Sequence, residues 1–182
     1  EPELGRDADT GGQVQYVLDL ARALAERPDV DRVELMTRQI LSSQIDWRYG
    51  EPLEQIADKA WIVRLPCGPQ RYLRKETLWP YLPQVVDNAL IHFREIGRVP
   101  DVIHSHYALP HAVSALLARD ISGRRVKCVT TLHGTDITVV GAHPSMMSIT
   151  RYAIERSDAV TAVSKSLIRD SEEKLGIRSG WI

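Results

Sequence analysis

Hydrophobic residues recur along the chain with two different periods, and their alternation predicts the order of helices and strands. Short hydrophobic, β-branched segments predict five buried strands, at residues 31–37, 60–66, 101–105, 126–132 and 159–163. Helical periods, with hydrophobic residues three or four apart, occur at residues 14–25, 76–97, 110–119, 145–156 and 164–175. Residues 38–59 are polar and irregular, and they predict a loop.

This alternation predicts an α/β fold, because strands separated by helices form a parallel sheet that is covered on both faces. Right-handed crossovers then give a doubly wound, Rossmann-like sheet. A chain of 182 residues is expected to form a single domain over residues 1–182. Because residues 1–4 are only Glu-Pro-Glu-Leu, the first strand of the sheet is expected to be missing.

Composition narrows the classes of protein that the sequence can represent. A formal net charge of −1 gives no basis for binding nucleic acid or an anionic membrane. No hydrophobic run approaches the roughly 20 residues of a membrane-spanning helix and no signal peptide is recognisable, so we expect a cytoplasmic protein. Cys67 and Cys128 lie far apart in hydrophobic surroundings, and we expect buried free thiols rather than a disulfide.

The segment at residues 5–25 carries the first candidate binding site. Asp9 or Thr10 can cap the helix that follows, and Gly11 and Gly12 let a ligand approach the backbone closely. The first-turn amides of a helix lack partners within the helix, and together with the helix dipole they attract phosphate or carboxylate groups. The alternative is a tight turn before an ordinary surface helix.

A second set of candidates lies where predicted strands end. His104 and His106 alternate along a strand end and therefore point to the same side of the sheet. Doubly wound folds bind ligands at the carboxyl ends of strands, so we expect both histidines to line the site. Tyr107 would offer its hydroxyl to a substrate, or else be a packed aromatic at the rim. A metal site including His111 is not expected, because no third ligand has convincing spacing.

His133 is the strongest catalytic candidate in the chain. It ends a buried strand next to Thr135 and Asp136, and the glycine that follows it leaves room for a ligand against the backbone. Thr131 lies on the same face of that strand and is expected to contact an acceptor. Arg151, on the next helix, can meet an acidic acceptor. The alternatives are a satisfied core histidine and a solvated arginine.

Residues 3–100 contain four motifs in a fixed order, DADTGGQVQYVLDLARALA, VELMTRQI, Asp46-Trp47 with Tyr49-Gly50-Glu51-Pro52, and RKETLWPYLP. This part of the chain resembles sucrose-phosphate synthases and the related sucrose synthases. Residues 101–177 contain IHSHYALPHAVSALLA, TTLHGTDITVVG and IERSDAVTAVSKSLI. This second part is more similar to the N-acetylglucosaminyl L-malate synthase of bacillithiol formation.

Both resemblances identify the chain as a member of the retaining glycosyltransferases of family 4, which have the GT-B fold of two Rossmann-like domains facing each other across a cleft. They imply that residues 1–182 are the acceptor-side domain and that the C-terminal donor-binding domain is absent. This fragment alone is therefore expected to be inactive. The implied substrate is a nucleotide sugar such as UDP-glucose, with no cofactor and no metal.

The resemblance also implies roles for individual residues. Gly11 and Gly12 offer backbone amides to the donor phosphate, and Gln13 reaches the acceptor. Lys75 stands where sucrose-phosphate synthases place a lysine on the phosphate of the acceptor; a solvated lysine is the alternative. His133 matches a histidine that lies in the cleft close to the donor sugar, and it is expected to be catalytic.

The implied function is the transfer of glucose from UDP-glucose to fructose 6-phosphate, as in sucrose-phosphate synthases. Those enzymes are expected to continue with Ser-Leu-Gly-Arg after the histidine, whereas His133 is followed by Gly-Thr-Asp. The N-acetylglucosaminyl malate synthase reaction, with a malate-like acceptor, is therefore an alternative. A non-catalytic fragment that binds anions or sugar phosphates and an engineered chimera are two more. The expected partners are a small-molecule acceptor and the missing domain, without nucleic acid or membrane.

Overall fold

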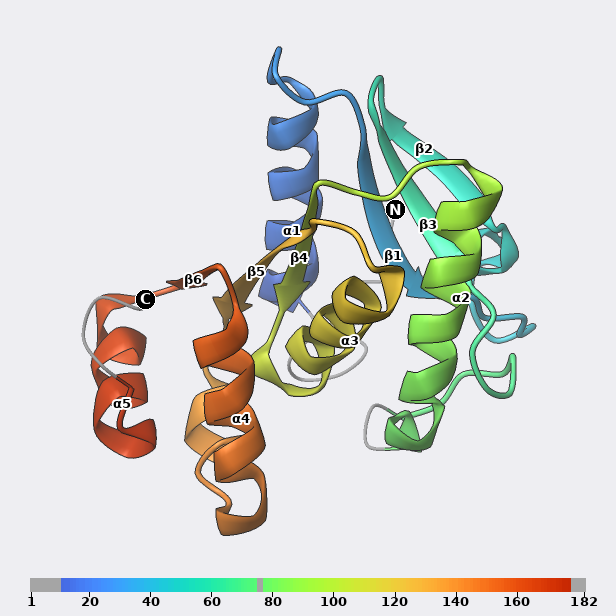
Figure 1. Ribbon diagram of the computed structural model, residues 1–182. Helices are drawn as coiled ribbons and strands as arrows, with labels where there is room; N and C mark the ends of the chain where they lie inside the picture. The colour runs from blue at the N-terminus through green and yellow to red at the C-terminus, as the bar shows by residue number, and fades with distance from the viewer. Residues whose placement is uncertain (1–10, 75–76, 178–182) are drawn as a thin grey trace. The chain divides into compact units, whose positions relative to one another are not determined.

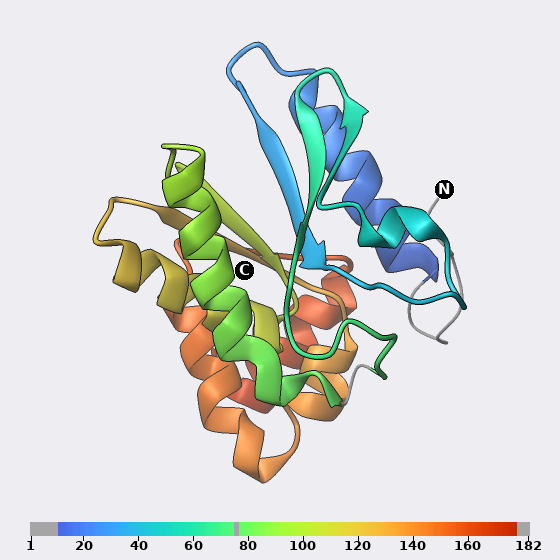
Figure 2. The same ribbon diagram turned by 90° about the vertical axis from the view of Figure 1, so that its right-hand side faces the viewer.

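The computed structural model describes residues 11–74 and 77–177, and the chain divides into two compact units, one within residues 1–75 and one within residues 76–182. Each unit contains a three-stranded sheet, with one α-helix packed on it in the first unit and several in the second (Figures 1 and 2). Parallel strands occur in both units, and in the second unit they alternate with helices, which confirms the predicted α/β class. The assignment of residues 1–182 to one acceptor-side domain stays a prediction.

The first unit packs one helix against a sheet with the strand order β1–β3–β2. β1 (Val33–Arg38) and β3 (Ala60–Leu65) run parallel, from Val33 opposite Ala60 to Arg38 opposite Leu65. α1 (Gly11–Ala25) contacts the sheet with the hydrophobic face that its period predicts, burying Leu18, Ala21 and Ala25. The helix and both strands are therefore confirmed, with boundaries shifted by only a few residues.

The predicted loop over residues 38–59 is wrong in part. This segment contains a 3₁₀ helix, Trp47–Gly50, and a strand, β2 (Leu53–Ala57), which pairs antiparallel with β3. The sequence of β2 is LEQIA, with two polar residues at its centre and an exposed leucine at its start, so its composition matches a surface segment. The partner strand β3 decides its conformation, because strand formation depends on cross-strand pairing more than on intrinsic preference.

Arg64 of β3 binds residues 49–54 of this segment to the sheet. Its side chain is only 4% exposed, and it forms an ion pair with the Glu54 carboxylate of β2. The Arg64 Nη1 atom also donates to the Glu51 carbonyl at 3.1 Å, and the guanidinium lies over the Tyr49 ring at 5.7 Å from its centroid. One buried cation therefore binds three positions of a segment that lacks a hydrophobic pattern of its own.

The second unit is built on an all-parallel sheet in the order β4–β5–β6. Its strands are β4 (Val102–His106), β5 (Lys127–Leu132) and β6 (Ala159–Ala162). Its helices are α2 (Leu82–Glu95), α3 (Val113–Ser122), α4 (Pro144–Arg156) and α5 (Lys165–Leu175).

One face of this sheet carries the core of the second unit. α3 packs on Ile103 and Cys128, and α2 packs along α3. The larger cluster joins β5, β6, α4 and α5 through eight buried residues, Ala108, Leu132, Ile137, Ile154, Val160, Leu167, Leu175 and Ile177. The register places His104, Thr131 and Thr161 on the opposite face, because paired residues of parallel strands share a face. Both cysteines are buried and free, as predicted.

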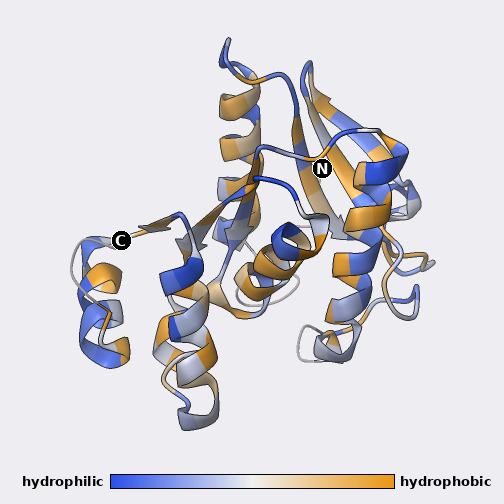
Figure 3. Ribbon diagram, in the orientation of Figure 1, coloured by the Kyte–Doolittle hydropathy of each residue, from blue (hydrophilic) through white to orange (hydrophobic). Residues whose placement is uncertain are grey.

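Local signals set the ends of the helices in the second unit. The Ser164 hydroxyl accepts a hydrogen bond from the Leu167 amide at 3.2 Å, and Gly176 takes a left-handed conformation with φ of 62°, so both predicted ends of α5 are confirmed. This helix carries both hydrophilic and hydrophobic residues (Figure 3). α2 begins later than predicted, at Leu82, because Pro80 lies in a preceding 3₁₀ helix. α3 begins at Val113, after an irregular turn.

We expect replacement of Arg64 by methionine to lower the free energy of unfolding by about 2 kcal/mol, because the Glu54 carboxylate and the Glu51 carbonyl lose their buried partner. Urea denaturation of Arg64→Met measures this change. Arg71→Met, at an exposed position of the same unit, is the control. Equal denaturation midpoints for the two variants would contradict the role given to Arg64.

Candidate active site

Three imidazole rings meet at the carboxyl ends of β4 and β5. His104 and His106 project from the same face of β4 and stack with ring centroids 4.7 Å apart and an interplanar angle of 21°. His133 directly follows β5, and its Nε2 atom lies 3.0 Å from Nδ1 of His106. Parallel pairing of β4 with β5 creates this arrangement, which the spacing of the histidines along β4 partly predicted.

Hydroxyl groups anchor the ring of His104. Its Nε2 atom lies 2.7 Å from Oγ1 of Thr131, and that oxygen lies 2.8 Å from Oγ1 of Thr161 on β6. Thr131 is only 1% exposed. Its hydroxyl already has two partners inside the protein, so at most one of its three hydrogen-bonding positions is left for an acceptor. The acceptor-binding role of Thr131 stays a prediction.

The environment of the three rings favours their neutral forms. Burial, with smaller contributions from the imidazoles around it, lowers the pKa of His106 to about 3. Burial, followed by the nearby His133, lowers the pKa of His104. Burial also lowers the pKa of His133, partly opposed by the Asp136 carboxylate. At physiological pH the cluster is therefore uncharged and presents hydrogen-bonding nitrogens rather than cations.

A buried carboxylate organises the loops around this cluster. Asp136 is 1% exposed, and its Oδ1 atom accepts hydrogen bonds from the amides of Gly134 at 2.9 Å and His133 at 3.2 Å. Its Oδ2 atom accepts from the amide of Ala108 at 3.0 Å, at the end of β4. Sequence reasoning identified Asp136 only as a neighbour of His133. The available signal was a short acidic side chain just after a strand end, where such residues often bind nearby amides.

Tyr107 has a backbone conformation that side chains rarely adopt, with φ of 77°. Its amide donates to the Thr131 carbonyl at 2.9 Å, and the next amide, that of Ala108, is held by Asp136. The Tyr107 ring lies 4.9 Å from the His133 ring, tilted by 44°. Such strain persists where the surroundings over-determine the backbone, and it is concentrated at functional sites.

Arg151 is the remaining predicted site residue of the second unit. Its contacts among the described residues do not connect it to the imidazole cluster. Arg151 forms an ion pair with Glu155 one turn along α4, with Nε 2.8 Å from Oε1. It also lies near the end of α5, since a Cβ atom added to Gly176 would be 3.8 Å from Nη1 of Arg151. Its acceptor-binding role stays a prediction.

The other predicted contacts belong to the first unit or lie outside the described residues. Gly11, Gly12 and Gln13 form the first described turn of α1, and a Cβ atom added to Gly12 would meet no atom within 4 Å. Lys75 and the predicted capping residues, Asp9 and Thr10, lie outside the described residues. The roles of all these residues stay predictions.

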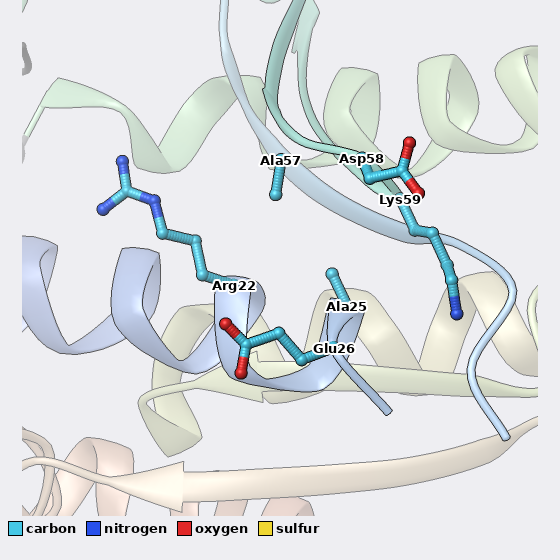
Figure 4. Close-up of a pocket in the computed structure, with 6 residues that line it drawn as sticks. All are labelled: Arg22, Ala25, Glu26, Ala57, Asp58 and Lys59. Atoms are coloured by element: carbon cyan, nitrogen blue, oxygen red, sulfur yellow. The ribbon is translucent and has the colours of Figure 1, made fainter. Parts of the chain in front are cut away.

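A cavity of about 370 Å³ opens at the other end of α1 (Figure 4). The Lys59 ammonium at its edge donates to the carbonyls of Arg27 at 3.0 Å and Val30 at 2.7 Å, so it secures the turn after α1. The lining contains positively charged, negatively charged and small hydrophobic side chains. These are Arg22 and Lys59, Glu26 and Asp58, and Ala25 and Ala57. None of the predicted site residues lines this cavity.

The described residues lack two further features, a metal-binding cluster and a membrane-spanning helix. Over residues 11–74 and 77–177, no three side chains of histidine, cysteine, aspartate or glutamate are arranged to hold a metal ion. No helix within the same residues is long and hydrophobic enough to cross a membrane.

Comparison with known sequences gives a consistent result over the whole chain. Residues 10–182 match the family model of Glycosyltransferase Family 4. A probable sucrose-phosphate synthase 5 from Oryza sativa subsp. japonica is 39% identical in a match that covers 98% of this chain and 23% of that protein. A probable sucrose-phosphate synthase 1 from Oryza sativa subsp. indica is 49% identical over 64% of this chain and 13% of that protein. This chain therefore spans less than a quarter of the curated relatives that it matches.

Solved structures support the same fold. A sucrose-phosphate synthase from Thermosynechococcus elongatus superposes with a TM-score of 0.73 at 21% identity, over 91% of this chain and 40% of that one. A second structure of a sucrose-phosphate synthase from the same organism gives a TM-score of 0.66 at 19% identity, over 92% of this chain and 86% of that one. At these identities the likeness shows the fold.

Replacement of Asp136 by asparagine is expected to lower the free energy of unfolding by about 2 kcal/mol, because an amide nitrogen would then face a backbone N–H at a buried position. Urea denaturation measures the loss. Asp101→Asn, at an exposed position before β4, is the matched control. Unchanged stability of Asp136→Asn would show that the carboxylate does not hold the two loops.

The low pKa of His106 predicts a loss of stability in acid. The folded-state value of about 3 lies below the ordinary 6.5, so between these pH values the unfolded chain binds a proton that the folded chain excludes. Stability is therefore complete above about pH 6.5 and falls as the pH drops toward 3, by at most about 1.4 kcal/mol per pH unit. The remaining solvent access of the ring reduces this slope. Urea midpoints at pH 7 and pH 4.5 should differ less for His106→Phe than for the wild type; equal differences would refute the assignment.

Proposed function

The chain belongs to glycosyltransferase family 4, and on that premise we propose that it is the acceptor-side part of a retaining hexosyltransferase that moves glucose from UDP-glucose to fructose 6-phosphate. The observation that carries this proposal is the neutral imidazole cluster at the carboxyl ends of β4 and β5, the edge at which doubly wound sheets bind ligands. The sucrose-phosphate synthases among its relatives support the choice of donor and acceptor.

The reaction requires a positioned acceptor hydroxyl and stabilisation of the diphosphate that leaves the donor sugar. We assign His133 to the donor sugar, where a neutral imidazole exchanges hydrogen bonds with sugar hydroxyls without attracting a stray anion. The amides of Gly11 and Gly12 serve the donor phosphate, because backbone amides at the start of a helix bind anions. Gln13 and Lys75 serve the acceptor, with the Lys75 ammonium on its phosphate.

Three further residues complete the proposed acceptor side. The Tyr107 hydroxyl contacts the acceptor from beside His133, and the strained backbone of Tyr107 is the reason to place it there. Thr131 acts through its hydroxyl, and Arg151 meets an acidic acceptor after releasing Glu155. The nucleotide contacts come from a donor-binding domain outside these 182 residues, the reaction needs no metal, and it takes place in the cytoplasm.

A second candidate reaction is transfer of N-acetylglucosamine to malate. Asp136 favours it, because its carboxylate occupies the amides of His133 and Gly134. A Ser-Leu-Gly-Arg sequence after the histidine, as expected of sucrose-phosphate synthases, has no acidic side chain for this role. In this reaction the malate carboxylates would take the place of the acceptor phosphate.

The intact protein, assayed with UDP-glucose and fructose 6-phosphate, should form a sugar phosphate product. His133→Ala is expected to lower kcat by a factor on the order of 100 or more. Lys75→Ala should raise KM for fructose 6-phosphate about 10- to 100-fold, the loss of one charge-assisted hydrogen bond, and should leave KM for UDP-glucose unchanged.

Lys127→Ala is the control for Lys75→Ala, because Lys127 begins β5 at the edge opposite the cluster, where it pairs with Asp158. Turnover of UDP-N-acetylglucosamine with malate, and not of the first pair, would establish the second candidate. Absence of turnover with both pairs would refute the proposed function.

A further inference from the structure

His106 lies between two other imidazoles, although the proposed chemistry uses only one of them. Its ring stacks on His104, and its Nδ1 atom is 3.0 Å from Nε2 of His133. Among the described residues, the titratable groups around it include His104 on β4, the Tyr107 hydroxyl at the end of β4, His111 in the turn after β4, and His133 and Asp136 in the loop after β5. The His106 ring therefore contacts one imidazole by stacking and a second by a hydrogen bond.

A hydrogen bond between two neutral imidazoles contains one proton, which restricts the tautomers of both rings. If Nδ1 of His106 donates, Nε2 of His133 is bare and the proton of His133 sits on Nδ1. If Nε2 of His133 donates, its Nδ1 is bare and becomes an acceptor. In either arrangement the tautomer of His133 is coupled to that of His106.

The same contacts restrict the orientation of the His133 ring. The Thr131 hydroxyl, which itself contacts Thr161, holds the His104 ring, and the His106 ring stacks on that ring. The backbone of His133 is fixed separately, because its amide donates to Asp136. His133 is therefore held at two points, at its backbone amide by Asp136 and at its ring Nε2 atom by His106.

We propose that His106 is a positioning residue that fixes the tautomer and the ring plane of His133, and so decides whether Nδ1 of His133 donates or accepts a hydrogen bond. This inference rests on the proposed catalytic role of His133. It gives His106 a role that acts through His133. In histidines generally, the hydrogen bond of one ring nitrogen sets whether the other nitrogen carries the proton.

The test compares variants of the intact protein by imidazole ¹⁵N chemical shifts, which report tautomers directly, and by steady-state kinetics. His106→Phe keeps a ring on His104 and removes both nitrogens. His106→Asn keeps an amide near the position of Nδ1, whereas His106→Gln moves the amide outward by one methylene. The asparagine and glutamine pair has matched polarity, so it preserves the comparison if the phenylalanine variant does not fold.

We expect a single His133 tautomer in the wild type and in His106→Asn, and averaging of two tautomers in His106→Phe and His106→Gln. The averaging variants should lose kcat by a factor on the order of 100, with KM little changed, as expected for a misplaced catalytic group. His92→Phe on α2 controls for loss of a histidine elsewhere and should match the wild type.

Unchanged His133 shifts in both His106→Phe and His106→Gln would overturn the inference, whatever the activity. Averaged shifts with full activity, together with an active His133→Ala, would support positioning by His106 and overturn the catalytic role of His133. The spectroscopic result and the kinetic result thus separate failure of this inference from failure of the proposed function.

Discussion

The Asp136 carboxylate, with three backbone amides donating to it in a buried position, is the contact on which the candidate site depends. Two of these amides follow β5 and one follows β4, so a single side chain joins the ends of neighbouring strands. Charge-assisted hydrogen bonds of this kind are stronger than those between neutral groups. They keep Tyr107 in its strained backbone conformation and His133 beside His106.

The imidazoles supported by this contact form a neutral site. Burial lowers the pKa of all three rings, and neighbouring imidazoles lower the pKa of His104 and His106 further. A neutral cluster suits a reaction in which the substrates bring the negative charge and a sugar must be oriented by directional hydrogen bonds. The proposed charge for the acceptor phosphate then comes from Lys75, and the proposed anion contact for the donor from the amides of α1.

The sequence match to the family and the structural match to a solved enzyme indicate the same fold. The match to Glycosyltransferase Family 4 covers residues 10–182, and a sucrose-phosphate synthase structure superposes over 91% of the chain. The sequence resemblance changed near residue 100, yet the probable sucrose-phosphate synthase 5 from rice matches 98% of the chain. The polar segment around β2 fits the same fold because Arg64 binds it to β3.

The sequence by itself determined features that depend on neighbours along the chain. The periods of α1 and of the five predicted strands, the Ser164 cap and the Gly176 end of α5, and the shared face of His104 and His106 all follow from local spacing. Tertiary structure decided β2, which needs β3 as a partner, and the hydrogen bond between His106 and His133, which needs two strands in register. It also decided the role of Asp136, because the Ala108 amide that completes its binding lies 28 residues away in sequence. Hydrogen bonds between distant segments leave no periodic signal in a sequence, and only folding brings their partners together.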